Sequence, residues 1–275
     1  DGVASTTFDK AVAVWAAALQ SDGKLLVAGD YGTRALVVRY RADGRPDAAF
    51  DADGIVSTDL GTGTTASARA LALQADGRVV VAGTVHGANA QATDFFVARY
   101  LADGSLDASF GTNGVVVTDV GKLDPLAGGA ASDSASGVVV QADGRIVVTG
   151  TSDGRFALAR YTASGALDAS YGGNGVATAQ MSNGTDVAAG AVLQPDGRVV
   201  VAGATTDHAG DQRFAVARFD ALGNLDASFG TGGRATTGFG FFASAGTSVA
   251  LQPDGAIVVA GVDRNLSGTG NFALA

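Results

Sequence analysis

Few residue types in this chain could carry out chemistry. The 27 acidic residues are all aspartates, and the chain has two histidines, no cysteine and no glutamate. Without cysteine there is no disulfide, no thiolate metal site and no cysteine nucleophile. Any carboxylate pair for acid–base catalysis would have to consist of two aspartates, so the composition favours binding over catalysis.

Both histidines, His86 and His208, fall in segments that we expect to be loops between strands. Asp207 and Asp211 flank His208, so a weak metal site is one hypothesis for that loop. One histidine per loop is more often a solvated polar residue, and the two histidines belong to repeats that are not neighbours. We therefore predict no metal site.

Aromatic residues outside the repeated pattern are the stronger candidates. Trp15 is the only tryptophan, Tyr31 lies in a predicted loop, and three phenylalanines cluster at residues 239–242. Exposed aromatics at a concave, polar-rimmed site suit sugar rings or the apolar side chains of a partner protein. The alternative is that Trp15 fills the centre of the fold and the phenylalanines pack beneath their own loop. The predicted ligand-binding residues are Trp15, Tyr31, His86, His208, Phe239, Phe241 and Phe242.

Nine other aspartates recur at fixed positions of a repeat. Five of them precede a glycine in a predicted hairpin turn, and four more lie three residues before an aromatic residue. A residue needed once for chemistry has no reason to occur four or five times, so we interpret these aspartates as structural. Calcium is the ion that such oxygen-rich turns would suit, but no stretch matches the twelve-residue calcium loop. We expect no cofactor.

Two phrases repeat along the whole chain. The first appears as LQSDGKLLVAG (19–29), LQADGRVVVAG (73–83), VQADGRIVVTG (140–150), LQPDGRVVVAG (193–203) and LQPDGAIVVAG (251–261). The second follows the first four copies, for example as VARYLADGSLDASFGTNG at 97–114 and LARYTASGALDASYGGNG at 158–175. The repeat length is about 58 residues.

Each repeat divides into four strands. In copy two these are predicted at 70–73, 78–82, 95–101 and 115–118, with Asp-Gly as the first hairpin turn. Four antiparallel strands in each of five copies predict an all-β fold, a five-bladed β-propeller of four-stranded antiparallel blades. We predict a single domain, residues 1–275, with first strands starting near residues 16, 68, 136, 190 and 248.

The copy number predicts how the ring closes. Copy five stops within its third strand, and Asp1-Gly2-Val3 matches the start of a fourth strand, Asn113-Gly114-Val115. We therefore expect residues 2–6 to complete blade five, closing the ring without a free sheet edge. An open β-solenoid and a strand-swapped assembly, in which residues 2–6 complete a neighbouring chain's blade, are the rival predictions. The start at Asp1 without methionine suggests a mature or excised product.

The loops sort into two kinds. Turns between the first and second strands and between the third and fourth are nearly uniform among the copies. The remaining loops vary in length and content, and variable loops on a rigid scaffold commonly bind ligands. They lie at 30–34, 84–94, 151–155, 204–212 and 262–270, and at 59–67, 119–134, 180–188 and 238–246.

The paired phrases LQPDGRVVVAG and FALARYTASGALDASYGGNG resemble the bacterial delta-sixty repeat. The resemblance covers the whole chain and implies a β-propeller in a large secreted or surface protein. It implies no catalytic residue.

The function predicted from these observations is a non-catalytic binding or scaffold module of a secreted or cell-surface bacterial protein. It would engage glycan or protein through the variable loops. The alternatives are a glycoside-processing enzyme with paired aspartates in the central channel, and an architectural subunit of a larger assembly. The net charge of −9 argues against nucleic acid as a partner, and the longest apolar run, residues 11–19, is too short for membrane insertion. We expect a monomeric ring.

Overall fold

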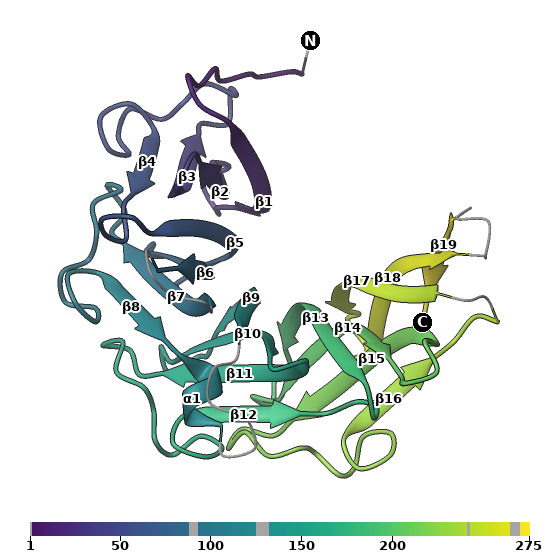
Figure 1. The fold of residues 1–275 in the computed structure, drawn as a ribbon. Helices are drawn as coiled ribbons and strands as arrows, with labels where there is room; N and C mark the ends of the chain where they lie inside the picture. The colour runs from purple at the N-terminus through teal and green to yellow at the C-terminus, as the bar shows by residue number, and fades with distance from the viewer. Residues whose placement is uncertain (1, 88–92, 125–131, 241–242, 265–269) are drawn as a thin grey trace. The chain divides into compact units, whose positions relative to one another are not determined.

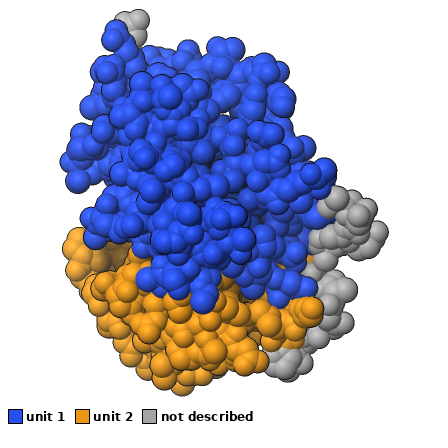
Figure 2. Space-filling view, turned by 90° about the vertical axis from the view of Figure 1, so that its left-hand side faces the viewer, with its two compact units in different colours: residues 1–119, 163–166 blue, residues 120–162, 167–275 orange. Residues whose placement is uncertain are grey.

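The computed structural model describes residues 2–87, 93–124, 132–240, 243–264 and 270–275. The described residues are all-β apart from one short helix (Figure 1). The chain divides into two compact units. Unit 1 comprises residues 1–119 and 163–166, and unit 2 comprises residues 120–162 and 167–275 (Figure 2).

Unit 1 contains two four-stranded antiparallel sheets, one for each of the first two copies of the repeat. Copy one forms β1 (Val12–Leu19), β2 (Leu25–Tyr31), β3 (Arg34–Tyr40) and β4 (Ile55–Thr58). Copy two forms β5 (Thr65–Leu73), β6 (Val79–His86), β7 (Thr93–Tyr100) and β8 (Val115–Thr118).

Unit 2 contains one four-stranded and one seven-stranded sheet. Copy three forms β9 (Asp133–Val140), β10 (Ile146–Ser152), β11 (Arg155–Tyr161) and β12 (Val176–Ala179). Copies four and five share the larger sheet through a single parallel pair, Gln212 with Ala243. Its strands are β13 (Thr185–Leu193), β14 (Val199–Thr206), β15 (Gln212–Phe219), β16 (Arg234–Thr237), β17 (Ala243–Leu251), β18 (Ile257–Arg264) and β19 (Gly270–Leu274). The helix α1 (Val120–Leu123) was not predicted from the sequence.

Within each copy the strands follow one another as a meander. The four strands predicted for copy two are confirmed; the fourth has the predicted bounds, and the first two extend further than predicted. The first strands of the five copies begin at Val12, Thr65, Asp133, Thr185 and Ala243, a few residues before the predicted starts. The prediction that the chain is one domain stays a prediction.

The second strand of each complete copy is the centre of the core. In β6 the four residues Val79–Ala82 are fully buried, and so are four residues of β7, Phe95–Ala98. The unbroken apolar runs in the sequence therefore correspond to strand segments whose side chains are buried without alternation.

A β-bulge interrupts the first strand of every copy. In β5 the bulged residue is Arg69, between the pairs Ala68–Gly83 and Ala70–Ala82. The bulge brings the Ser67 carbonyl oxygen so close to Gly83 that a Cβ there would overlap it. Glycine is therefore required opposite the bulge, because any side chain would collide with backbone.

A buried arginine holds each turn between the third and fourth strands. In copy two, Arg99 donates from Nε to Asp107 Oδ2 at 2.9 Å, and its guanidinium lies 4.6 Å from the centroid of the Phe110 ring. Asp107 Oδ1 accepts the amide of Ser109 at 3.0 Å. The interpretation of these aspartates as structural is confirmed. The same triad recurs as Arg39–Asp47–Phe50, Arg160–Asp168–Tyr171 and Arg218–Asp226–Phe229.

The predicted closed five-bladed ring is wrong. Among the described residues, 2–11 form no strand, and β19 is paired with β18 alone. Copies four and five also merge into one sheet instead of forming two separate blades. The likeness of residues 1–3 to the start of a fourth strand is a property of the sequence and does not determine which strand these residues contact. The contacts that residues 2–11 do make are with copy one, where Thr6 Oγ1 lies 2.8 Å from the Tyr40 hydroxyl oxygen.

Candidate binding site

Trp15 is the bulged residue of β1. The pairs on either side of it are Val14–Gly29 and Ala16–Ala28, so the indole leaves the regular alternation of the strand. Its side chain is 48% exposed. The sequence placed Trp15 where the strand begins; the structure places it in the middle. The equivalent bulged residues are Arg69, Ser136, Ala189 and Thr247.

Asp30 on β2 fixes the orientation of the indole. Trp15 Nε1 donates to Asp30 Oδ2 at 2.7 Å. The same oxygen accepts the Ser67 hydroxyl at 3.1 Å, and Asp30 Oδ1 accepts the Ala68 amide at 3.1 Å. One carboxylate thus ties Trp15 to both the second strand of copy one and the first strand of copy two. The equivalent residue in copy three, Thr151, accepts the Ala188 amide in the same way, at 2.9 Å from Oγ1.

Arg69 completes the cluster. Its guanidinium carbon lies 3.8 Å from the centroid of the Trp15 ring system, which is a cation–π contact. Among the described residues, the Arg69 guanidinium makes no hydrogen bond or ion pair. We call these four residues the Trp15 cluster: Trp15, Asp30, Ser67 and Arg69. The cluster combines a partly exposed aromatic surface with a cation whose hydrogen-bond donors remain available to a ligand.

Tyr31 lies next to Asp30 on β2 and is held by the segment before β1. Its hydroxyl donates to Asp9 Oδ1, and its ring lies 5.7 Å from that of Phe8 and 5.3 Å from Lys10 Nζ. The hydrogen bond with Asp9, together with partial burial, raises the pKa of Tyr31, and the same bond lowers the pKa of Asp9. Trp15 and Tyr31 therefore belong to one sheet, but each has its own set of contacts.

The other predicted ligand-binding residues are dispersed. His86 ends β6 and is exposed in unit 1. His208 is exposed between β14 and β15 in unit 2, where its amide donates to Asn183 Oδ1 at 3.3 Å. Phe239 packs edge to face on Phe214, with 4.9 Å between the ring centroids, which agrees with the alternative that the phenylalanines pack within the fold. Phe241 and Phe242 lie outside the described residues.

Two aspartates have the raised pKa values that a general acid would need. Burial raises the pKa of Asp94, and the neighbouring Asp119 raises it further. Burial likewise raises the pKa of Asp186, whose oxygens accept the Thr205 hydroxyl at 2.6 Å and the Met181 amide at 2.7 Å. The hydrogen bond from the Met181 amide holds the segment that leads into β13. A raised pKa is a property of catalytic acids, but it is also expected of any buried structural carboxyl group.

Gly150-Thr-Ser-Asp-Gly154 has the Gly-x-Ser-x-Gly spacing of a serine hydrolase elbow, so the expectation that the sequence contains no such motif is wrong. Such an elbow requires a strand, a sharp turn and a helix. Here Ser152 ends β10 and a two-residue turn leads directly into β11, with Asp153 and Gly154 both at positive φ. Ser152 is also fully buried, so its hydroxyl is not presented to a substrate.

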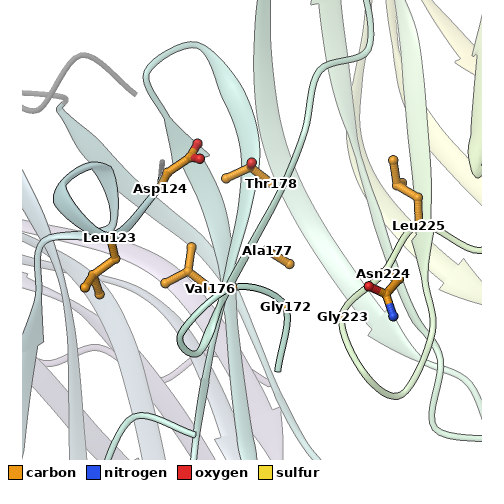
Figure 3. A pocket seen from close by; sticks show the side chains of 10 residues that line it. Leu123, Asp124, Gly172, Val176, Ala177, Thr178, Gly223, Asn224 and Leu225 are labelled. Carbon is orange, nitrogen blue, oxygen red and sulfur yellow. The ribbon is translucent and has the colours of Figure 1, made fainter. Parts of the chain in front are cut away.

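A groove beside the fourth strand recurs in several copies and was missed by the sequence analysis. In copy three it encloses about 300 Å³, and Figure 3 shows Val176, Ala177 and Thr178 between α1 on one side and the loop of Asn224 on the other. The one charged residue of this pocket, Asp124, forms an ion pair with Arg155 at 3.4 Å. Equivalent grooves lie beside β8 and β16. Because the groove recurs in three copies, we interpret it as a result of the repeated packing of the strands and not as a specific binding site.

The sequence matches a family model in four segments. The family is described as "Domain of unknown function (DUF5122) beta-propeller", and the matched residues are 20–50, 74–110, 141–171 and 194–229. Each segment runs from the first hairpin turn to the aromatic residue of the arginine triad. The matched segments of the chain are therefore similar to the repeats of a β-propeller family. No match to a curated protein is found.

Solved structures support the same fold class. A virginiamycin B lyase from Staphylococcus aureus is 15% identical, with a TM-score of 0.54 over 94% of this chain and 69% of the other. The extracellular domains 1–2 of Drosophila Semaphorin 1a are 12% identical, with a TM-score of 0.52 over 97% and 53%. An endo-arabinase from Bacteroides thetaiotaomicron is 10% identical, with a TM-score of 0.50 over 95% and 92%. At these identities the likeness shows a propeller-like fold and nothing about activity.

Within the described residues, no helix has the length and apolar character needed to cross a membrane.

Proposed function

We propose that this protein is a non-catalytic binding module that engages a glycan through the Trp15 cluster. The observation that carries the proposal is the stacked pair of Trp15 and Arg69, 3.8 Å apart, in which an exposed indole lies beside a cation with unused donors. A flat aromatic surface can pack against the C–H face of a sugar ring. A guanidinium beside it can donate hydrogen bonds to hydroxyl or carboxylate oxygens of the same ligand.

Preorganisation supports this proposal. Trp15 is held by the Asp30 carboxylate and by the stacked guanidinium, so little side-chain entropy would be lost on binding. A partner protein remains the second candidate, because tryptophan and arginine are also the residues that contribute most to protein interfaces.

The enzyme alternative has weaker support. The repeated aspartates are held in ion pairs, and their pKa values are lowered, as for Asp107 at about 2. A carboxylate with so low a pKa cannot act as a general acid near neutral pH. The solved structures of similar fold include enzymes and signalling domains alike, so they favour neither class.

The setting is proposed from the resemblance to the delta-sixty repeat. The proposed setting is a secreted or cell-surface bacterial protein, in which the chain is a monomeric module or a subunit of a larger assembly. We propose no cofactor and no nucleic acid partner, the latter because of the net charge of −9.

A binding experiment on an array of immobilised glycans tests the proposal. The unsubstituted chain is compared with Trp15→Ala and with Leu222→Ala, which removes another exposed apolar side chain, 58% exposed, in unit 2. We expect Trp15→Ala to lose binding by at least tenfold, about 1.4 kcal/mol, and Leu222→Ala to bind as the parent does. Equal binding by all three chains, or binding to no glycan, would contradict the proposal.

A further inference from the structure

Arg69 is a charged residue at a position where the repeat accepts small residues. It is the bulged residue of β5, and the equivalent residues of copies three, four and five are Ser136, Ala189 and Thr247. The fold therefore does not require a cation here. Arg69, Ser136 and Ala189 are all half-buried, in copies that have another copy before and after them in the sequence. Partial exposure thus belongs to the position itself and does not depend on the ends of the chain.

The nearby Asp30 carboxylate does not neutralise Arg69. Its two oxygens accept hydrogen bonds at 2.7 Å from Trp15 Nε1, at 3.1 Å from the Ser67 hydroxyl and at 3.1 Å from the Ala68 amide. Among the described residues, Arg69 forms no ion pair with this carboxylate or with another. Along β1, β2, β5 and β6, the strands around the cluster, Arg69 is the only lysine or arginine and Asp30 is the only acidic residue.

The side-chain donors still available in the Trp15 cluster belong to Arg69. The indole N–H of Trp15 is already used by Asp30, whereas a guanidinium has five N–H donors and no acceptor. Two of these donors match the two oxygens of a carboxylate, and such charge-assisted pairs are roughly twice as strong as hydrogen bonds between neutral groups. The cluster therefore suits a ligand that carries a carboxylate better than one that carries only hydroxyl groups.

The stacking of Arg69 on Trp15 limits how a sugar can bind. The guanidinium carbon lies 3.8 Å from the centroid of the ring system, so it covers one face of the indole. A sugar ring has to pack on the other face, and the 48% exposure of Trp15 leaves surface for it. A carboxylate on a neighbouring sugar can then reach past the edge of the indole to Arg69. This arrangement favours an oligosaccharide over a single sugar.

We propose that the glycan bound at the Trp15 cluster is acidic, namely an oligosaccharide that contains uronic acid residues. One sugar ring packs on Trp15, and a carboxylate of the same ligand pairs with Arg69. This inference rests on the proposed function and adds the chemical class of the glycan. The net charge of −9 opposes a general attraction of anionic polymers to the chain. A preference for acidic sugars must therefore arise locally, from Arg69.

Reduction of the sugar carboxyl groups tests this inference on the unsubstituted chain. Oligogalacturonate and oligomannuronate are each compared with the same oligosaccharide after its carboxyl groups have been reduced to primary alcohols, which preserves linkage and stereochemistry. We expect calorimetry to show about tenfold tighter binding of at least one acidic form than of its reduced form. Equal affinities of the acidic and reduced forms would overturn the inference and leave the glycan site in place. Binding of neither form, together with no binding on the glycan array, would overturn the proposed function as well.

Substitution of Arg69 identifies the residue responsible for the preference. In Arg69→Gln, the affinities for the acidic and reduced forms should lie within about twofold of each other, because the charge and the paired donors are gone. Arg69→Lys should keep only part of the preference, since an ammonium group does not pair bidentately with a carboxylate. Arg213→Gln in unit 2 removes another cation, 50% exposed, and should keep the full preference. A preference that survives in Arg69→Gln, or that Arg213→Gln also abolishes, would contradict the inference.

Discussion

At the scale of single residues, the four arginine triads stabilise the uniform turns, and three of their arginines also link successive copies. Arg39, Arg99 and Arg160 each donate to a backbone carbonyl of the following copy, those of Ala102, Ala163 and Ala221. The side chains of these arginines are 5–7% exposed, whereas Arg218 is 18% exposed. The four triads therefore make the same ion pair, but the arginine of the fourth triad is more exposed to solvent.

This difference predicts a graded loss of stability. Arg99→Met leaves the buried Asp107 carboxylate with only Arg78 as an ionic partner, and should cost about 3 kcal/mol of the free energy of unfolding. Arg218→Met should cost about half as much, because its ion pair is closer to solvent. Urea denaturation of the two variants measures both values, and a larger loss for Arg218→Met would contradict this account.

The turn aspartates also predict how stability depends on pH. Burial opposes the ionisation of Asp107, but hydrogen bonds from Ser109 and the charges of Arg99 and Arg78 outweigh it and lower its pKa to about 2. Bonds from Ser228 lower the pKa of Asp226 to about 2 as well. A folded-state pKa below the unfolded value means that the stabilisation is complete above about pH 4 and is lost as the pH falls toward about 2.

The urea midpoint should therefore be steady near neutral pH and decrease steeply between about pH 4 and 2. Asp107→Asn should be less stable than the parent at neutral pH and should lose less on acidification, because one of the titrating groups is gone. If the plots of urea midpoint against pH for the parent and for Asp107→Asn were parallel, Asp107 would not contribute to the acid transition.

The structural role of the repeated aspartates could be predicted from the sequence, since they recur in every turn. The arginines that bind them could not be assigned, because each one joins a third strand to a turn eight residues further on and to the following copy. Trp15 was selected for being unrepeated, but Asp30 and Arg69 were missed, since nothing in local sequence brings three strands together.

At the scale of elements, the bulged first strand and its facing glycine form one unit. The sequence signal for the bulge was present, because an isolated glycine within a strand pattern indicates a bulge or a close backbone approach. In four copies, a Cβ added to the facing glycine would overlap a carbonyl oxygen of the first strand. These glycines are Gly29, Gly83, Gly203 and Gly261. The bulge in turn sets the direction of Trp15, so the candidate site depends on it.

A glycine substitution tests this dependence. Gly83→Ala should destabilise the protein by about 3 kcal/mol, because the new methyl group collides with the Ser67 backbone, which cannot move without disturbing the Asp30 network. Gly173→Ala is the matched control, since an added Cβ there has no atom within 4 Å. Thermal unfolding of the two variants gives the comparison; similar melting temperatures would mean that the bulge is not required.

At the scale of the whole molecule, the sequence predicts the number and order of the strands well, because apolar runs and Asp-Gly turns are local signals. The sequence does not predict correctly how the sheets join, because the expected closed ring is wrong. Complementary ends show that residues 3–6 could serve as a fourth strand, but which edge they join depends on contacts between distant segments. The merging of copies four and five through Gln212 and Ala243 is likewise a single long-range contact without a local signal.

Binding of a saccharide at Trp15, without chemical change to the sugar, can be measured directly. Since Trp15 is the only tryptophan, its fluorescence reports directly on the site. The measurement is a titration of the chain with a panel of soluble oligosaccharides, followed by mass spectrometry of the recovered sugars. The account predicts a saturable blue shift of the emission with at least one member of the panel, which is recovered intact. Cleavage of the bound sugar, or an emission spectrum that no member of the panel changes, would contradict it.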